Sequence, residues 1–535
     1  MGNFVNPGNT QFVDDISSKI YVDKSDMVVE LNDYYRTVDK YICMSRARRF
    51  GKTMMTNLLV AYYSKGCDSR ALFEKLKLSR HEGWDKHLNN VNVISIDVNS
   101  EYSDLDDKLS FVPVLQQNVV DELREAFPNV ALESENTIAS AITKIFNSTG
   151  ESFVFIMDEY DVLFRDKEVD KSVRESYLAM LNALFKSNKT TKAINLAYLT
   201  GILPIIREQV QSKLNNFNEF TMLDPKAFAP YFGFTEQEVK ELCQTHNMDY
   251  ERCAAMYDGY FFSGIGHIFN PNSVSKCIRN RDYDSYWNYT SSFDAITCYI
   301  EEDMLGILDD IRTMLEGGEI CINTDLYKNN ITNFDSKDKV FTYLIHLGYL
   351  ALVRKGVKNY CRIPNNEVKI EWFNAMQDAK RFKSIYNIIE PSIKVLSATE
   401  NCDSVAVATA LDYFHTQYSS SLTYNLESSM QSAILMAYFY ANRDYMVFAE
   451  LPTGQGFADV AFIPLQRESP AIIVELKKDG EPQVAIDQIK SRNYAQAFKK
   501  HPGQGVLLVG ITYDPKEHKH KCLIEKVEDY KEVWK

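Results

Sequence analysis

The chain has 535 residues, of which 45% are hydrophobic and 25% are charged, and its formal net charge is −14. At roughly 100–200 residues per domain this length predicts about three domains with packed cores. The acidic balance argues against a protein coated in nucleic acid. The ten cysteines include no CxxC pair, so we expect reduced, mostly buried thiols rather than a zinc knuckle or a disulfide scaffold. Neither a signal peptide nor an apolar run of about 18 residues is found, which predicts a cytoplasmic protein with no membrane partner.

The first part of the chain, residues 1–224, alternates short apolar runs with helical patterns. Buried strands are expected at residues 41–44, 91–98, 153–157 and 194–199, and helices at 58–63, 114–127 and 177–186. Strands that alternate with helices are typical of a parallel sheet with helices on both faces. We therefore expect an α/β domain here.

Residues 225–330 have a mainly helical pattern and are interpreted as a lid region. Thr235 precedes an amphipathic stretch and is followed three positions later by Glu238, which is the spacing of a capping box. We therefore expect a helix to begin after Thr235.

Residues 331–400 are interpreted as a winged-helix-like segment followed by a linker. A helix leads into an apolar run at 348–353, and further strands are expected at 357–363 and 368–372, with a Pro-Asn-Asn turn at 364–366. A helix followed by a small hairpin is the pattern of a winged helix.

The last part, residues 401–535, follows a helical stretch at 382–412 and a boundary expected near 399–404. A helix is expected at 426–442, strands at 445–451, 457–464, 471–476 and 505–512, and a long amphipathic helix at 483–498. This mixture predicts a second α/β domain.

A phosphate-binding pattern lies between the first strand and the first helix. The motif GxxxxGK[ST] needs a loop whose backbone N–H groups wrap phosphates, a lysine for the β- and γ-phosphates and a hydroxyl for Mg²⁺. Gly51, Lys52 and Thr53 supply its second half, whereas Arg46 stands at the position of the first glycine. The other loop residues expected at the nucleotide are Arg48, Arg49 and Phe50. A chance Gly-Lys-Thr at a helix start is the alternative.

Acidic residues follow the apolar run at 153–157, in the Walker B pattern. Asp158 is expected to hold Mg²⁺ and Glu159 to polarise the attacking water. The carboxyl ends of parallel strands meet at one edge of the sheet, where nucleotides bind. Thr200, or Arg207 just beyond it, is a candidate sensor of the γ-phosphate, and a local structural role stays open for both. The two motifs together predict ATP and Mg²⁺ as cofactors.

A second group of acids lies on the expected C-terminal strands. Asp459 is followed sixteen residues later by Glu475 and then by Lys477. Two carboxylates on neighbouring strands can share one Mg²⁺, with Mn²⁺ as an alternative, and the C=O of Leu476 can be a further ligand. Residues two apart on a strand share a face, so Lys477 can position a water beside the metal. Glu450 is a nearby acid that we interpret as a surface residue. Four histidines without ligand spacing are interpreted as surface or loop residues: His415, His501, His518 and His520.

These motifs resemble one family, the AAA-ATPase-like proteins fused to a PD-(D/E)XK nuclease domain. The matching signals are Tyr21–Lys24, Arg46–Thr53, Phe155–Asp161, Leu199–Gly201, Phe232–Thr235, Tyr257–Tyr260, Phe269–Pro271, Gly348–Leu350, Pro364–Val368 and the C-terminal acids. The family itself carries a basic run at the front of the phosphate loop. The resemblance implies that Gln488 orients the nuclease site, with Tyr494 further along the same helix, and that Glu427 can join the metal shell.

The fold that follows is α/β, with an N-terminal P-loop ATPase domain, a helical and winged-helix-like middle and a C-terminal restriction-endonuclease-like domain. The leading expectation is an ATP-binding ATPase coupled to a Mg²⁺-dependent nuclease. Its partners would be ATP and nucleic acid, with DNA favoured over RNA, and a homo-oligomer is left open. The competing hypothesis is a nucleotide-dependent signalling switch or scaffold with a non-catalytic nuclease-like domain.

Overall fold

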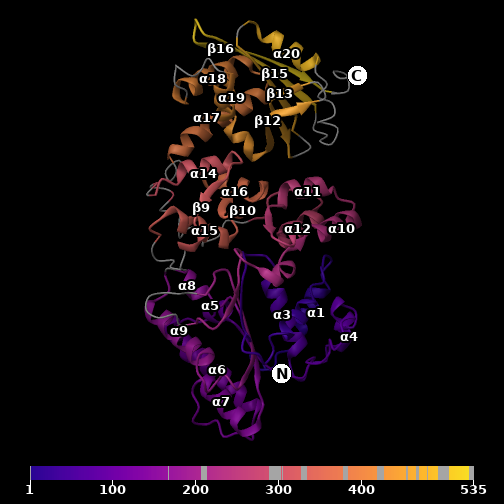
Figure 1. Ribbon diagram of the computed structural model, residues 1–535, viewed down its shortest axis with the longest axis vertical. Helices are drawn as coiled ribbons and strands as arrows, with labels where there is room; N and C mark the ends of the chain where they lie inside the picture. Colours follow the sequence, from indigo (N-terminus) through magenta and orange to yellow (C-terminus); the bar gives the residue numbers. More distant parts are fainter. Residues whose placement is uncertain are drawn as a thin grey trace.

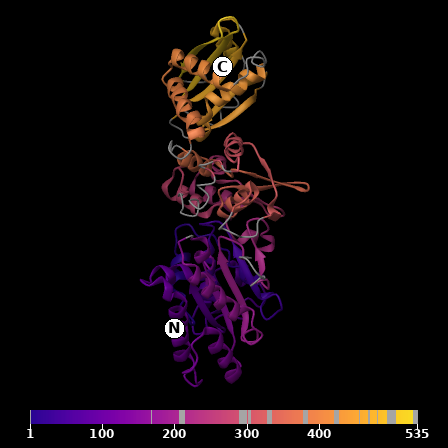
Figure 2. The ribbon, with the colours of Figure 1, turned by 90° about the vertical axis from the view of Figure 1, so that its left-hand side faces the viewer.

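The computed structural model describes residues 2–166, 168–205, 214–287, 300, 303, 305–326, 334–376, 383–418, 427–453, 456–465, 469–478, 480–491 and 505–528. They form an elongated molecule of three parts stacked along its long axis, with the N-terminal part at one end and the C-terminal part at the other, as Figure 1 and Figure 2 show. Among these residues, no helix is long and apolar enough to cross a membrane.

The N-terminal part is built on a parallel sheet of five strands in the order β2-β3-β4-β1-β5. The strands are β1 (Tyr41–Ser45), β2 (Asn92–Asp97), β3 (Phe153–Asp158), β4 (Ile194–Gly201) and β5 (Asn218–Phe220). The four strands expected from apolar runs are confirmed. The short edge strand β5 has no such run and was not expected.

Helices cover both faces of this sheet, because alternate residues of each strand point to opposite sides. Tyr41 and Cys43 pack in the core on one face, and Ile42 and Met44 pack in the core on the other. The first face is covered by α6 (Phe111–Ala126), α7 (Ile138–Thr149) and α9 (Lys171–Phe185), and the second by α1 (Thr10–Ile16), α2 (Met27–Asn32) and α3 (Lys52–Tyr63). Shorter helices are α4 (Arg70–Phe73), α5 (Val98–Ser103), α8 (Val162–Arg165), η1 (Lys77–Arg80), η2 (Lys108–Ser110) and η3 (Lys226–Tyr231).

The first half of the middle part contains the expected helices and a small sheet that was not expected. The helices are α10 (Glu236–His246), α11 (Tyr250–Tyr257) and α12 (Pro271–Asn280), and the antiparallel strands are β6 (Phe234–Thr235), β7 (Tyr260–Phe262) and β8 (Gly266–Phe269). The capping box at the start of α10 is confirmed, since the Glu238 N–H donates to Thr235 and the Thr235 N–H donates to Glu238. Lys24 also donates to Glu238 at 2.6 Å, which ties the N-terminal segment to this part.

The second half of the middle part corrects one sequence expectation. It contains α14 (Leu308–Leu315), β9 (Ile320–Ile322), η4 (Thr324–Leu326), α15 (Lys337–Leu347), β10 (Ala351–Lys355), β11 (Lys358–Arg362) and α16 (Asn366–Met376). The hairpin joins β10 to β11, and the strand expected at 368–372 is wrong, because these residues lie in α16. The buried residues Val368, Trp372 and Met376 are spaced four apart, which is helical, and the Asn365 side chain accepts from the Val368 N–H at the start of the helix.

The C-terminal part is a mixed sheet of five strands in the order β12-β13-β14-β15-β16, in which only β14 and β15 run parallel. Its strands are β12 (Tyr445–Thr453), β13 (Gly456–Pro464), β14 (Ala471–Lys477), β15 (Val506–Asp514) and β16 (Lys519–Val527), and its helices are α17 (Lys383–Glu400), α18 (Ser404–Tyr418), α19 (Glu427–Ala437), η5 (Phe439–Arg443) and α20 (Pro482–Ser491). The four expected strands are confirmed, and β16 is additional. The boundary expected near 399–404 falls at the turn between α17 and α18, and Thr399 of α17 bonds to Tyr438 of this part.

The burial of the histidine and cysteine side chains tests the sequence expectation for each. His520 is wrong as a surface residue, since it lies buried in β16 with its Nδ1 2.8 Å from Asp412. His415 is half-buried on α18 against Tyr513, His518 is exposed in the β15–β16 turn as expected, and His501 lies outside the described residues. The described cysteines are free thiols, and most are buried, as the spacing predicted.

Candidate functional sites

The phosphate loop runs from the end of β1 to the start of α3, at the carboxyl edge of the parallel sheet. Gly51 is the N-cap of α3 and has a φ of 87°, a left-handed conformation that favours glycine. Within the described part of the chain, no side chain caps the first N–H groups of α3. A helix start of this kind attracts anions, because its N–H groups point outward and its dipole is positive there.

Lys52 is the first residue of α3 and lies almost fully buried inside the loop. Its Nζ donates to the backbone C=O groups of Arg46 and Ala47 at 3.2 and 3.1 Å. Burial lowers the pKa of Lys52, while the nearby acids Glu159 and Asp158 oppose this shift. A buried ammonium whose hydrogen bonds go to backbone carbonyl groups is well suited to meet a phosphate.

Asp158 ends β3 and joins side chains from two other elements. Its Oδ2 accepts from the Thr53 hydroxyl at 2.7 Å, and its Oδ1 accepts from the Thr200 hydroxyl at the end of β4. Burial raises the pKa of Asp158, and these two hydrogen bonds oppose the rise. The structure therefore brings three predicted residues together, and their oxygen atoms are the ligand type that Mg²⁺ prefers.

Glu159 follows Asp158 but faces a different partner. It has a φ of 49°, and its Oε2 accepts from Arg165 of α8 at 2.7 Å. Arg165 is almost fully buried and also lies 3.1 Å from Asp161. Burial raises the pKa of Glu159, but Arg165 and Lys52 outweigh burial and hold that pKa below its usual value. Glu159 is thus an ionised carboxylate held by an arginine that the sequence interpretation missed.

The basic residues at the front of the loop do not all face the phosphate site. Arg46 is completely buried and donates to the C=O groups of Ser45 and Phe220, so it anchors β5. Burial lowers the pKa of Arg46 to about 9. Arg46 therefore has a structural role at this motif position, and a glycine there would leave the space that its side chain occupies unfilled.

Arg48, Arg49 and Phe50 differ in where their side chains lie. Burial lowers the pKa of Arg48, which lies close enough to Arg165 and Glu159 to interact with their charges. Arg49 instead donates to the Tyr286 C=O at 2.7 Å. Phe50 is buried in the core of the middle part. The Arg49 and Phe50 side chains thus contact the middle part of the molecule. Arg207 lies outside the described residues.

The second site lies on β13 and β14. Val460 pairs with Val474 in the antiparallel register, so Asp459 and Glu475 are the next positions along the two strands. The Asp459 Oδ2 accepts from the Leu476 N–H at 2.7 Å. This contact and the register place the two predicted acids at neighbouring positions on adjacent strands inside the sheet.

Glu475 is surrounded by two of the other predicted residues. It is 1% exposed, its Oε1 lies 3.3 Å from the Nζ of Lys477, and the same oxygen accepts from the Gln488 side chain of α20. A buried carboxylate needs such donors, because its charge is costly in a low dielectric. Asp459 is also fixed from α19, where Gln431 donates to its backbone C=O at 2.8 Å. Gln431 was not identified from the sequence, and no motif spacing pointed to it.

The metal-binding capacity of this second site rests on few groups. Among the described residues, no set of three or more His, Cys, Asp or Glu side chains could hold a metal ion. Asp459 and Glu475 supply two carboxylates, and hard oxygen ligands of this kind fit Mg²⁺ or Mn²⁺. Glu427 begins α19, but its side chain, that of Glu450 and residue Tyr494 lie outside the described part of the chain.

Comparison with known families gives two matches on separate parts of the chain. The family described as "Predicted AAA-ATPase" matches residues 11–211, which contain the phosphate loop, Asp158 and Thr200. The family described as "PD-(D/E)XK nuclease superfamily" matches residues 427–522, which contain Asp459, Glu475 and Gln488. No curated protein matches the chain.

Proposed function

We propose that this chain, in which an AAA-ATPase-like domain is joined to a PD-(D/E)XK nuclease superfamily domain, is an ATP-regulated, metal-dependent nuclease. ATP would bind and be hydrolysed at the N-terminal site. Phosphodiester bonds of nucleic acid would be cut at the C-terminal site, and DNA is the substrate to test first. One observation carries the nuclease assignment: Asp459 accepts from the backbone N–H next to Glu475, and Glu475 accepts from Gln488, so that residues predicted on three separate elements meet on β13 and β14.

At the N-terminal site, each proposed role follows from a contact described above. Lys52 would exchange its two carbonyl partners for phosphate oxygens, to which it binds more strongly because the pair is ionic. Thr53 and Asp158 would hold Mg²⁺, which when bound supplies charge neutralisation between the phosphates. Thr200 bonds to Asp158 and would report the state of this carboxylate to β4.

Glu159 is the residue proposed to orient the attacking water. Its ion pair with Arg165 holds the carboxylate in the ionised form that accepts a hydrogen bond from water. The same ion pair occupies Oε2, so full activity requires Glu159 to turn away from Arg165 or to use its other oxygen. In the proposed site, Arg165 therefore restrains Glu159, the residue that orients the attacking water.

At the C-terminal site, Asp459 and Glu475 would hold the metal ion, which when bound supplies Lewis-acid catalysis. Lys477 has a side chain that is 27% exposed, so its ammonium can reach a water and a scissile phosphate while it remains near Glu475. Gln488 would keep the Glu475 carboxylate in one orientation, as partners behind a metal ligand do in other sites.

The first experiment incubates the full chain with DNA and RNA substrates, with Mg²⁺ or Mn²⁺, and with or without ATP. Asp459→Asn tests the nuclease site, and Asp514→Asn, an acid at the end of β15 on the same sheet, is the matched control. Lys52→Ala tests the ATP site, and the exposed Lys65→Ala is its control. Cleavage that survives Asp459→Asn would rule out the proposed nuclease centre, and cleavage independent of ATP and of Lys52 would rule out the coupling.

A nucleotide-dependent switch with a non-catalytic C-terminal domain is the second candidate. It is favoured by the occupancy of Glu475, whose carboxylate already receives Lys477 and Gln488, and by the lack of a third acid among the described residues. Binding of Mn²⁺ to the full chain separates the two candidates, because only the nuclease requires binding that is lost in Asp459→Asn. Light scattering with and without ATP would test whether the chain forms a homo-oligomer.

A further inference from the structure

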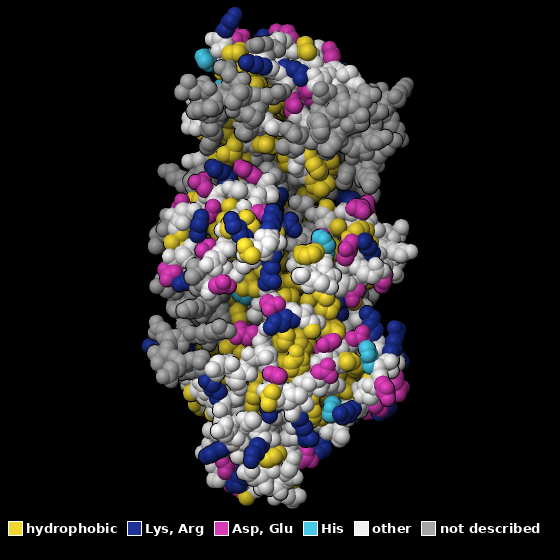
Figure 3. Space-filling model, viewed as in Figure 1, with side chains coloured by type: hydrophobic (Ala, Val, Ile, Leu, Met, Phe, Trp, Pro, Cys, Tyr) yellow, Lys and Arg dark blue, Asp and Glu magenta, His cyan; other side chains and the backbone are white. Residues whose placement is uncertain are grey.

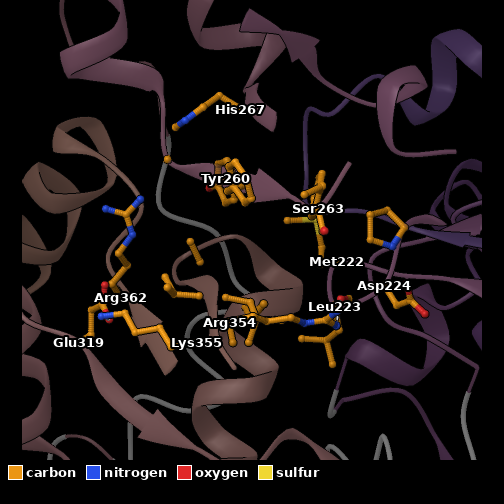
Figure 4. A pocket seen from close by; sticks show the side chains of 18 of the residues that line it. Met222, Leu223, Asp224, Tyr260, Ser263, His267, Glu319, Arg354, Lys355 and Arg362 are labelled. Atoms are coloured by element: carbon orange, nitrogen blue, oxygen red, sulfur yellow. Dashed lines mark hydrogen bonds and ion pairs between the residues drawn. The ribbon is translucent and has the colours of Figure 1, made fainter. Parts of the chain in front are cut away.

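A pocket of about 590 Å³ opens in the middle part of the molecule, away from both sites described above. It lies between the turn at 222–226 that follows β5, the strand β7, and the hairpin of β10 and β11 (Figure 4). A volume of this size is in the range of pockets that hold small organic ligands, which is about 300–1,000 Å³.

Aromatic side chains from β7 form one wall of the pocket. Tyr260 and Phe262 are buried, and Tyr260 lies near the centre of Figure 4. Phe261 is 55% exposed, which is unusual for a large apolar ring, and its edge lies against His267 at a centroid distance of 5.4 Å. An exposed ring beside a pocket offers a flat surface for stacking.

Cationic side chains surround the same pocket in a chain whose net charge is −14. They are Lys226, Arg354, Lys355 and Arg362, against two acids, Asp224 and Glu319. Figure 3 shows Lys and Arg side chains gathered on this face, over the part that carries β9 and β10. A local positive surface on an acidic protein indicates an anionic partner.

The hairpin itself places like charges next to each other. Lys355 and Lys358 are direct cross-strand partners on either side of the turn, an arrangement that destabilises a hairpin unless other charges compensate. Glu319 offsets the charge of Lys355 through an ion pair in which the Lys355 Nζ lies 2.6 Å from the Glu319 Oε2. The Lys355 side chain is still 59% exposed. A phosphate chain along the hairpin would neutralise both lysines.

We propose that this pocket binds an unpaired base of a single-stranded nucleic acid, with the neighbouring phosphates on the β10–β11 hairpin. The inference rests on the proposed nuclease function and names where the substrate strand is held. Stacking of bases on aromatic rings beside a basic surface is the general mode of single-strand binding. A duplex keeps its bases stacked inside, so it offers no free base to an enclosed pocket.

The pocket is also connected to the phosphate loop. The Tyr260 ring packs edge-to-face on Phe50 of that loop at 5.3 Å, and its hydroxyl donates to the Gly348 C=O. Gly348 in turn lies so close to the loop that an added Cβ would be 2.8 Å from the Ala47 side chain. Tyr260 is the neighbour of Phe261 on β7, so we expect a base bound at Phe261 to change the ATPase rate through this strand.

The test measures binding of fluorescein-labelled oligo-dT to the full chain by fluorescence anisotropy, in EDTA and without nucleotide. Phe261→Ala should weaken binding about tenfold, because stacking contributes roughly 1–3 kcal/mol per base. Tyr413→Ala, which removes another exposed ring on α18, should leave binding unchanged. Lys355→Ala should lower the slope of log affinity against log salt by about 0.7, which Lys394→Ala on α17 should not do.

Any of three binding results would overturn the proposal, and a competition result is a fourth. The three are no effect of Phe261→Ala, equal weakening by the control variants, or a duplex of the same length that binds as tightly and depends equally on Phe261. Competition by an acidic peptide as effective as oligo-dT would also overturn it, since a peptide has no base to stack. Because EDTA removes metal and no ATP is present, these outcomes are independent of whether Asp459 and Lys52 are catalytic.

Discussion

The two candidate sites differ in whether their lysine is buried. At the N-terminal site a lysine and a carboxylate are both buried, with Lys52 6% and Asp158 2% exposed, whereas the carboxylate of Glu159 is 30% exposed. At the C-terminal site the carboxylate of Glu475 is 1% exposed, whereas Lys477 is 27% exposed. A charge acts more strongly from a low-dielectric position. The buried lysine therefore indicates that the first site, the anion site, attracts an anion beside its buried acid, whereas the second, the cation site, is built to attract a cation.

The largest expected effect breaks the cation site alone. Asp459→Asn should lower nuclease activity by at least about 100-fold, since even residues behind a metal ligand contribute roughly 10–100-fold. ATP hydrolysis should be unchanged, because Asp459 lies in a different domain from Lys52. Gel-based cleavage and phosphate release measure the two activities on the same preparation, and parallel loss of both would contradict two independent sites.

The next effect breaks the anion site. Lys52→Ala should weaken ATP binding by roughly 10–100-fold, because a charge-assisted hydrogen bond contributes about 1.5–3 kcal/mol. Lys65→Ala, which removes an exposed lysine paired with Glu151, should leave ATP binding as it is. Titration calorimetry with a non-hydrolysable ATP analogue provides the affinities. Full ATP affinity in Lys52→Ala would show that the buried lysine has no part in anion binding.

A third prediction concerns the link between the phosphate loop and the middle part. Arg49 donates to the Tyr286 C=O, and the Tyr286 N–H donates to Glu367 in the first turn of α16. Burial raises the pKa of Glu367 from 4.5 to about 7. Between these values the folded state binds more protons than the unfolded state, so the stability contribution falls as pH rises from about 4.5 to 7.

Glu367→Gln keeps the acceptor for Tyr286 but removes this titration. The variant should therefore be more stable than the parent above pH 7, by up to about 3 kcal/mol, and equally stable near pH 4.5. Urea unfolding at pH 5 and pH 8 measures the difference, with the exposed Glu241→Gln on α10 as the control. A parent and variant that lose stability equally between these two pH values would exclude Glu367 as the source.

The smallest effect sharpens the account of the cation site. Gln488→Leu removes the donor to Glu475 while it keeps a side chain of similar size, so Mn²⁺ affinity should fall about tenfold. Gln483→Leu, on the exposed side of the same helix, is the matched control. An unchanged Mn²⁺ affinity in Gln488→Leu would mean that Lys477 alone is enough to orient the carboxylate.

The two sites also differ in how their residues are arranged along the chain, and both arrangements could be predicted from the sequence. Asp459, Glu475 and Lys477 lie within twenty residues on two adjacent strands, and the alternation of strand side chains places them together. Thr53, Asp158 and Thr200 are far apart in the chain, yet parallel strands end at one edge, so their meeting was predictable as well.

Local patterns determined other parts of the fold. The helix start at Thr235 was predictable, because both members of its capping box lie within one turn. The segment at 368–372 was mistaken for a strand, because its five alternating apolar and polar residues fit the two-residue period of a strand. Only the spacing of the buried positions along the whole of α16 distinguishes a helix. The strand β16 was missed because its polar positions outnumber its buried ones.

The sequence by itself determined the order of the two domains, the phosphate motif and the acids of both sites, because each depends on spacing along one or two elements. Only the tertiary structure decided the partners that reach in from elsewhere: Arg165 on Glu159, Arg49 on Tyr286, Phe50 against Tyr260 and the pocket behind it. Such contacts join residues up to 237 positions apart. Their geometry follows from how sheets and helices pack, and no local period records it.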